Sequence, residues 1–240
     1  MEKFGKSQPV LRVEDVRFLT GQGRYVDDIA PENALYGYVF RSSVAHAVIT
    51  DLDVAQARGA EGVRAVITAD DLLAAGIDFA MAGATVKNID GSSGASPRRA
   101  LLAEKKVNFV GEPVAFIVAE TLNAARDAAE LIEFDYDDLD VKLDLEAGGP
   151  AIHDVAPDNV AFDWGMGDEE ATNAAFDAAA RTVSLEVPDN RIIVNSLEPR
   201  GCFAEWDGDR VHVSLGGQGV WGHKAEIARA LGLEPAQVRV

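Results

Sequence analysis

The spacing of apolar residues along the chain predicts a mixture of short strands and helices without a repeating unit. In several of the predicted strands, apolar and polar residues alternate, as they do in strands that bury one face. The run 113–120 is apolar on both faces, so we expect a central, buried strand there. Before residue 145, strands are predicted within residues 20–29, 35–43, 46–54, 63–68, 107–111, 113–120 and 133–141, and after it at 182–187, 190–195, 202–206, 210–215 and 237–240.

Helical spacing, together with start and stop residues, predicts five helices. Thr68 can cap the second helix, with Asp71 in the acidic third position, and Thr121 can cap the third. Because helices and strands do not alternate strictly, we predict an α+β fold. The helices are expected at residues 55–60, 69–76, 122–134, 168–182 and directly after the glycines near 219.

Local composition divides the chain into four parts: an arm at 1–19, a domain at 20–145, a linker at 146–162 and a second domain at 163–240. The linker is assigned because the stretch is rich in glycine, proline and aspartate. Within the first domain, small polar residues without periodicity predict a long surface loop at 80–99. In the second domain, Asp207-Gly208 predicts a hairpin turn.

Residues 217–222 have the G-x-G-x-x-G pattern of a dinucleotide-binding loop. That loop needs a buried parallel strand before it, a helix after it and an acid at the end of the next strand. Here the preceding strand has one polar face and is predicted to pair antiparallel through the hairpin, and residues 237–240 contain no acid. Only the helix agrees, so the sequence disfavours dinucleotide binding.

The glycines still need a physical reason. Gly216, Gly217 and Gly219 allow positive φ and close approach of another group. Gln218 between them either points into water from a tight turn or is presented to a ligand, and the residues alone leave both possibilities open. Its amide is neutral and can both donate and accept a hydrogen bond.

Composition and charge exclude several classes of function. The chain has 22 basic and 40 acidic residues, a net charge of −18, which repels nucleic acid and anionic lipid. The longest apolar run, 114–119, is far shorter than the roughly 20 residues of a membrane span. We therefore expect no nucleic-acid partner, no membrane span and, without a secretory signal, a cytoplasmic location.

The residues that usually bind metals are sparse. Cys202 is the single cysteine, so the chain can form no internal disulfide and hold no iron–sulfur cluster by itself. Four histidines, at positions 46, 153, 212 and 223, lack the spacing of a metal site. We predict no metal ligand in this chain.

Several stretches, in the same order along nearly the whole chain, resemble the large catalytic subunit of the molybdenum hydroxylases. This family includes xanthine dehydrogenase, aldehyde oxidase and aerobic carbon monoxide dehydrogenase, and the N-terminal run is most similar to the last branch. One of the stretches that carry the resemblance, residues 198–201, also has a simpler explanation as a strand-end turn with a salt bridge. The stretches are RVEDVRFLTG (12–21), GRYVDDI (23–29), RSSVAHA (41–47), VGEPVA (110–115), AARDAAEL (124–131), FDY (134–136), EPRG (198–201) and QGV (218–220).

The resemblance implies a fold and a site. Residues 20–145 would be an α/β hammerhead domain, and residues 163–240 would begin the first molybdopterin-binding domain. In the family, a glutamine at the position of Gln218 hydrogen-bonds an oxo ligand of molybdenum. This implies that Gln218 is presented to the cofactor, with Gly217 and Gly219 shaping its loop.

The resemblance also implies cofactors, partners and a reaction for the complete subunit. The cofactor would be molybdenum–molybdopterin in its cytosine dinucleotide form. The partners would be the remainder of the large subunit, a small subunit with [2Fe-2S] clusters, a medium subunit with FAD, and a small-molecule substrate. The reaction would be hydroxylation with oxygen from water, or oxidation of carbon monoxide at a molybdenum–copper pair.

The family's chain continues well beyond the position of Val240, into further pterin-binding segments and a glutamate base. We therefore expect the 240-residue chain to be part of a larger subunit, to bind none of these cofactors by itself and to be inactive alone. Two alternatives are a non-catalytic subunit-assembly module and a dinucleotide-binding protein that uses residues 217–222.

Overall fold

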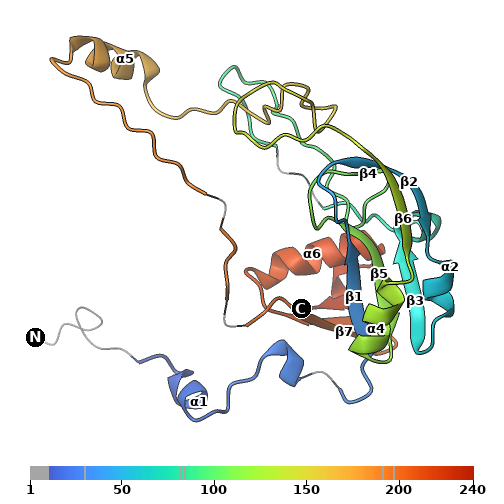
Figure 1. The fold of residues 1–240 in the computed structure, drawn as a ribbon. Helices are drawn as coiled ribbons and strands as arrows, with labels where there is room; N and C mark the ends of the chain where they lie inside the picture. The colour runs from blue at the N-terminus through green and yellow to red at the C-terminus, as the bar shows by residue number, and fades with distance from the viewer. Residues whose placement is uncertain (1–10, 30, 82, 84, 191, 197) are drawn as a thin grey trace, which may run out of the picture. The chain divides into compact units, whose positions relative to one another are not determined.

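The computed structural model describes residues 11–29, 31–81, 83, 85–190, 192–196 and 198–240 (Figure 1). The first ten residues of the predicted arm therefore lie outside the described residues. The chain divides into two compact units. The larger unit contains Leu35–Ile193 and Glu226–Leu233, and the smaller contains the residues through Ala34 with Val194–Ala225 and Glu234–Val240.

The larger unit is built around β5 (Pro113–Ala119), which lies between β1 (Tyr36–Arg41) and β3 (Val63–Thr68) and is antiparallel to both (Figure 1). On one face of β5, Ala115 and Ile117 are fully buried in the largest core cluster. On the other face, Val114 is equally buried in a second cluster. The prediction of a central strand buried on both faces is confirmed, since successive side chains of a strand point to opposite faces.

Three short helices accompany this sheet and begin where the sequence predicted. These are α2 (Ala55–Gly59), α3 (Ala69–Ala74) and α4 (Leu122–Ala129). The Thr121 hydroxyl accepts a hydrogen bond from the backbone N–H of Ala124, 3.1 Å away, at the start of α4. Thr68 and Asp71 form the expected reciprocal cap of α3.

A second three-stranded sheet has β2 (Ala47–Asp53) between β4 (Lys106–Val107) and β6 (Glu133–Asp138), all antiparallel. The strand predicted at 107–111 is therefore wrong in extent, because only its first residue belongs to β4. His46, the residue before β2, is buried, and its Nδ1 lies 2.6 Å from the carbonyl oxygen of Asp140. This contact gives His46 a structural role.

The predicted linker contains no helix or strand, and the side chain of Asn159 makes several of the hydrogen bonds that hold it together. Asn159 donates from Nδ2 to the carbonyl oxygens of Gly148 and Pro150, and its Oδ1 accepts from the N–H of Ile152. The neighbouring residues 86–95, part of the predicted surface loop, are also without helix or strand. They bond to the end of the linker through Ala95 N–H and the carbonyl oxygen of Ala161.

After the linker the chain is exposed at every residue from 161 to 190. Helix α5 (Glu169–Ala178), capped by Asp168, forms within the predicted range 168–182 but ends four residues before its predicted end, and it buries no residue. The strands predicted at 182–187 and 190–195 are wrong: the described residues there form neither strand nor helix. Alternation supplies an apolar face, but without a neighbouring strand there is nothing to bond its N–H and C=O groups.

The smaller unit contains a mixed sheet. Strand β8 (Val211–Leu215) pairs antiparallel with β7 (Cys202–Trp206), as the Asp207-Gly208 turn predicted, and parallel with β9 (Val238–Arg239). The connection from β8 to β9 runs through α6 (Val220–Leu231) and the short 3₁₀ helix η2 (Pro235–Gln237).

Two short helices precede the sheet in sequence: α1 (Asp15–Leu19) and η1 (Val26–Asp28). The short strand predicted within 20–29 is wrong. The carboxylate of Asp28 accepts the N–H of Tyr25 at 2.8 Å, which closes a helical turn where the apolar pattern indicated a strand.

Candidate functional site

The candidate site is the glycine loop, residues 216–219, between the end of β8 and the start of α6. Gly219 has φ +84°, a left-handed conformation that favours glycine. Gly217 has no room for a side chain: a β-carbon built there would lie 2.6 Å from Leu215 Cδ1 and 2.7 Å from His223 Nε2. The two glycines therefore serve different needs, one conformational and one steric.

Gln218 stands between them with its side chain exposed. Among the described residues, no hydrogen bond to its amide occurs, so both its donor and acceptor groups are available to a ligand. The carbonyl oxygen of Gly219 accepts the N–H of Gly222 at 3.1 Å, which closes the first turn of α6 immediately behind the loop. The loop thus presents, at the junction between β8 and α6, an amide that has no hydrogen-bond partner among the described residues.

The surroundings of His223 were not anticipated from the sequence, where it was one of four scattered histidines. It lies one turn into α6, and its Nε2 is buried under Gly217 without a hydrogen-bond partner among the described residues. The signal available in the sequence was its spacing of six residues from Gly217, which brings the first turn of a helix back toward the loop that precedes it.

The loop meets some requirements of dinucleotide binding and fails others. The parallel pairing of β8 with β9 through α6 is a strand–helix–strand crossover, which the antiparallel hairpin alone did not predict. However, the third glycine of the fingerprint allows close packing of helix on strand, and a β-carbon at Gly222 would meet no atom within 4 Å. Strand β9 also contains no acid. The crossover exists, but the packing that the fingerprint serves does not.

Within the smaller unit, Glu198 lies between the η1 turn and the glycine loop. Its Oε1 accepts the N–H of Val26 at 3.0 Å, and a β-carbon at Gly216 would lie 3.5 Å from its Oε2. The contact with Val26 joins residues 172 positions apart, which no local sequence pattern could indicate. No salt bridge of Glu198 occurs among the described residues, so the simple salt-bridge interpretation of residues 198–201 is not supported.

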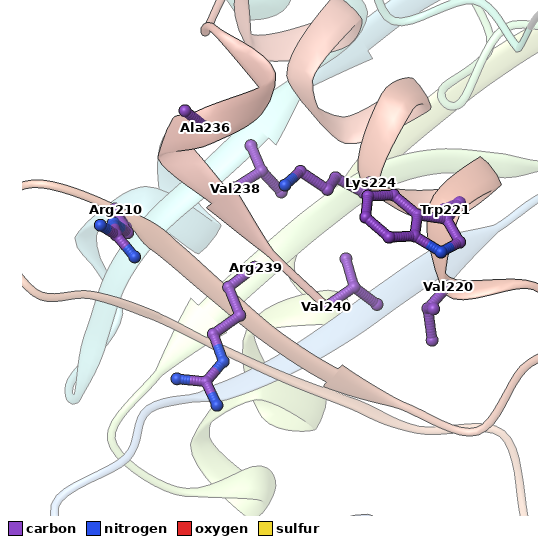
Figure 2. Close-up of a pocket in the computed structure, with 8 residues that line it drawn as sticks. All are labelled: Arg210, Val220, Trp221, Lys224, Ala236, Val238, Arg239 and Val240. Atoms are coloured by element: carbon purple, nitrogen blue, oxygen red, sulfur yellow. The ribbon is translucent and has the colours of Figure 1, made fainter.

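A hollow of about 200 Å³ opens next to the loop (Figure 2). Trp221 and Lys224 line it from α6, and Val238 and Arg239 line it from β9. The ammonium of Lys224 lies 5.6 Å from the centre of the Trp221 ring, within the range of a cation–π interaction. Arg210 completes a rim of three cations with no acid among the lining residues.

The β7–β8 turn carries the strongest electrostatic effect in the smaller unit. Backbone N–H groups of Arg210 and Asp209 and the ring of His212 hydrogen-bond the carboxylate of Asp207 and lower its pKa from 3.8 to about 2. The turn that aligns β8 is thus fastened by an ionised carboxylate. Cys202, at the start of β7, is exposed.

The described part of the chain contains no cluster of three or more histidine, cysteine or acidic side chains that could hold a metal ion. It also contains no helix with the length and apolar character needed to cross a bilayer.

Two family models match the sequence. The "aldehyde oxidase and xanthine dehydrogenase, a/b hammerhead domain" matches residues 20–140, and the "molybdopterin cofactor-binding domain" matches residues 152–240. Together they include both the β5 sheet and the glycine loop.

Individual relatives agree with these matches. The chain is 35% identical to the carbon monoxide dehydrogenase large chain of Afipia carboxidovorans, over 86% of this chain and 26% of the relative. It is 36% identical to the nicotine 6-hydroxylase large subunit of Paenarthrobacter nicotinovorans, over 87% and 25%. A crystal structure of a Cu,Mo-CO dehydrogenase superposes with a TM-score of 0.79 and 30% identity, over 95% of this chain and 30% of that one. The chain thus spans about a quarter of the length of the curated relatives it matches.

Proposed function

The chain belongs to the family of molybdenum hydroxylase large subunits, and on that premise we propose that it contributes the Gln218 loop to the active site of a molybdenum-dependent oxidoreductase. Its relatives include large subunits that act on carbon monoxide and on nicotine. The observation that carries the proposal is the exposed, uncommitted amide of Gln218 between two glycines that cannot be replaced without strain or overlap.

The residues of the loop suit a molybdopterin group that would lie beside them. They do not suit direct ligation of a metal by protein side chains. The loop offers an amide and bare backbone, and neither would compete with the cofactor for the metal. Gln218 would hold the cofactor, and Gly217 and Gly219 would keep the space in front of it clear.

When bound, the molybdenum cofactor would supply the redox chemistry, taking two electrons from the substrate. Gln218 contributes orientation: its amide can donate to one oxygen and accept from another group without carrying charge. The first turn of α6 fixes the backbone on one side of the loop, so the amide is presented from a defined position, and such preorganisation favours electrostatic stabilisation. A charged side chain at this position would change the potential at the reacting centre.

The finer identity of the system is part of the proposal. We assign the cytosine dinucleotide form of molybdopterin, a small subunit whose [2Fe-2S] clusters would accept electrons, and a medium subunit with FAD. The 240-residue chain would join the remainder of a large subunit. The single exposed cysteine supports placing the clusters on another chain.

The direct test is Gln218→Ala in the complete large subunit assembled with its partners. We expect a loss of turnover of about a hundredfold, the scale for removing one preorganised hydrogen-bonding group. Substrates tested would be carbon monoxide, an aldehyde, a purine and an N-heterocycle. Gln56→Ala, an exposed glutamine of the hammerhead, is the control. Unchanged turnover in Gln218→Ala would instead support a non-catalytic assembly module.

The isolated chain provides a second test. We expect the purified 240-residue protein to carry far less than one molybdenum per chain and to show no turnover, because most of the cofactor's contacts would come from polypeptide outside it. Elemental analysis measures this directly. A stoichiometric molybdenum content would contradict the proposed dependence on the remaining subunit.

A further inference from the structure

We propose that Glu198 is a positioning residue that fastens the glycine loop to η1 and so sets the direction in which Gln218 is presented. This role rests on the function proposed for Gln218. Glu198 is partly buried in the smaller unit, where it lies between two segments that are remote in sequence. Its two carboxylate oxygens face different neighbours.

The first oxygen holds η1. Oε1 accepts the backbone N–H of Val26 at 3.0 Å. The preceding N–H, that of Tyr25, is already bonded by the carboxylate of Asp28 within the same turn. Asp28 therefore satisfies the turn locally, and Glu198 ties it to the segment that leads into β7.

The second oxygen faces the entrance of the glycine loop. A β-carbon built at Gly216 would lie 3.5 Å from Oε2 and 3.7 Å from Cδ of Glu198, so the carboxylate lies beside Gly216, where any side chain would touch it. A second hollow, separate from that of Figure 2, is lined by Glu198 and Gly216 together with Arg24 and Tyr25 near η1 and Ser214 and Leu215 of β8. Glu198 and Gly216 both line this hollow, so the carboxylate stands where the two segments approach each other.

The loop needs such a support because its own residues supply little packing. Three of its four residues are glycines, and the fourth, Gln218, is exposed. Gly217 is held in the middle by Leu215 and His223, which leaves the entrance at Gly216 to be fixed from outside. Pro199 directly follows Glu198 and restricts its backbone to extended conformations, which limits how far the carboxylate can move.

Reach and acceptor geometry, rather than charge, define the role. Glutamine keeps the length and one acceptor oxygen, aspartate keeps the charge but is one methylene shorter, and alanine removes both. If Glu198 positions the loop, Glu198→Gln should resemble the native protein, whereas Glu198→Asp and Glu198→Ala should both release η1 and the loop.

Hydrogen exchange of the 240-residue chain, followed by mass spectrometry, tests this without any cofactor. In Glu198→Ala and Glu198→Asp we expect exchange about tenfold faster in peptides covering residues 24–29 and 214–222, the scale for losing one hydrogen bond to a charged group. Peptides from β5 should exchange at the native rate. Glu205→Ala, an exposed glutamate on β7, is the matched control and should change neither segment.

The proposal is overturned if residues 214–222 exchange at the native rate in both Glu198→Ala and Glu198→Asp, even when 24–29 is faster, since Glu198 would then cap η1 only. It is also overturned if Glu198→Gln accelerates exchange as much as Glu198→Asp. If Glu198→Ala does not fold, the Asp and Gln variants decide.

In the complete subunit, Glu198→Ala is expected to lower kcat with KM changed less than about twofold, as for an interaction made only in the transition state; a raised KM with native kcat would contradict the role. Gln218→Ala measured in parallel separates the two proposals. Native turnover in Gln218→Ala would reject the function assigned to Gln218, whereas native exchange in the Glu198 variants would reject only the positioning role.

Discussion

The β5 sheet and the segment 161–190 belong to the same compact unit and contain similar apolar residues, yet they are packed in opposite ways. Ile117 in β5 is 0% exposed, whereas Ile193, just after the segment, is 93% exposed. Helix α4 buries three alanines, whereas α5, which is longer, buries no residue. Apolar composition alone therefore does not determine which segments form the core.

The difference lies in available partners. Each strand around β5 has a neighbour that bonds its backbone and a helix or strand that covers its side chains. Residues 182–187 have the alternation of a strand but no such neighbour. A helix of the length of α5 is marginal in water without tertiary packing. Substitutions that are identical in chemistry should accordingly have very different effects in the two regions.

The largest effect is expected for Ile117→Ala. Removing a buried isoleucine side chain typically costs about 3 kcal/mol through lost burial and the cavity that remains. Urea unfolding followed by circular dichroism would measure the free energy of unfolding. Ile193→Ala makes the same chemical change at an exposed site and should stay within about 0.5 kcal/mol of the native protein. Equal losses would show that residues near 193 are packed in solution.

The next largest effect is expected in the glycine loop, with Gly217→Ala. The new methyl group overlaps Leu215 and His223, so we expect a loss of about 2 kcal/mol, typical of overpacking. Gly222→Ala, in the open first turn of α6, should be stabilising by up to about 1 kcal/mol. Thermal unfolding measures both variants. A destabilised Gly222→Ala that also loses NAD or FAD binding would support a dinucleotide site instead.

Two N-caps provide a finer comparison of the packed and exposed helices. Thr121→Ala removes the cap of α4 and should lower the free energy of unfolding by about 1 kcal/mol. Asp168→Ala removes the corresponding cap of α5. Because α5 buries nothing, we expect reduced helicity by circular dichroism and an unchanged urea midpoint. A shifted midpoint would mean that α5 contributes to the core.

The smallest effect is expected from pH. The pKa of Asp207 is depressed from 3.8 to about 2, so its contribution is fully present above about pH 4 and is lost as the pH falls toward 2. NMR titration of its carboxyl carbon measures the pKa. Asp207→Asn should remove this part of the acid dependence of the β7–β8 hairpin. A pKa near 3.8 would mean that the turn does not hold the ionised carboxylate.

Much of the larger unit, and the β7–β8 hairpin of the smaller unit, could be predicted from the sequence because their signals are local. The two-faced apolar run 113–120, the caps Thr121 and Thr68, and the Asp207-Gly208 turn each depend on neighbouring residues only. The family resemblance extended this to the fold class and to Gln218 as the candidate residue. The failures at 182–187 and 190–195 occurred where an alternating pattern had no strand beside it, and the failure at 20–29 occurred where the Asp28 carboxylate closes a helical turn.

By itself, the sequence determined the secondary-structure elements with strong local signals and the glycine-framed position of Gln218. Only the tertiary structure decided that β8 also has a parallel neighbour, that Gly217 lies on His223, and that Glu198 reaches Val26. The physical reason is distance along the chain: capping and turn energies act over three or four residues, whereas sheet pairing and side-chain packing join residues whose separation no local pattern encodes.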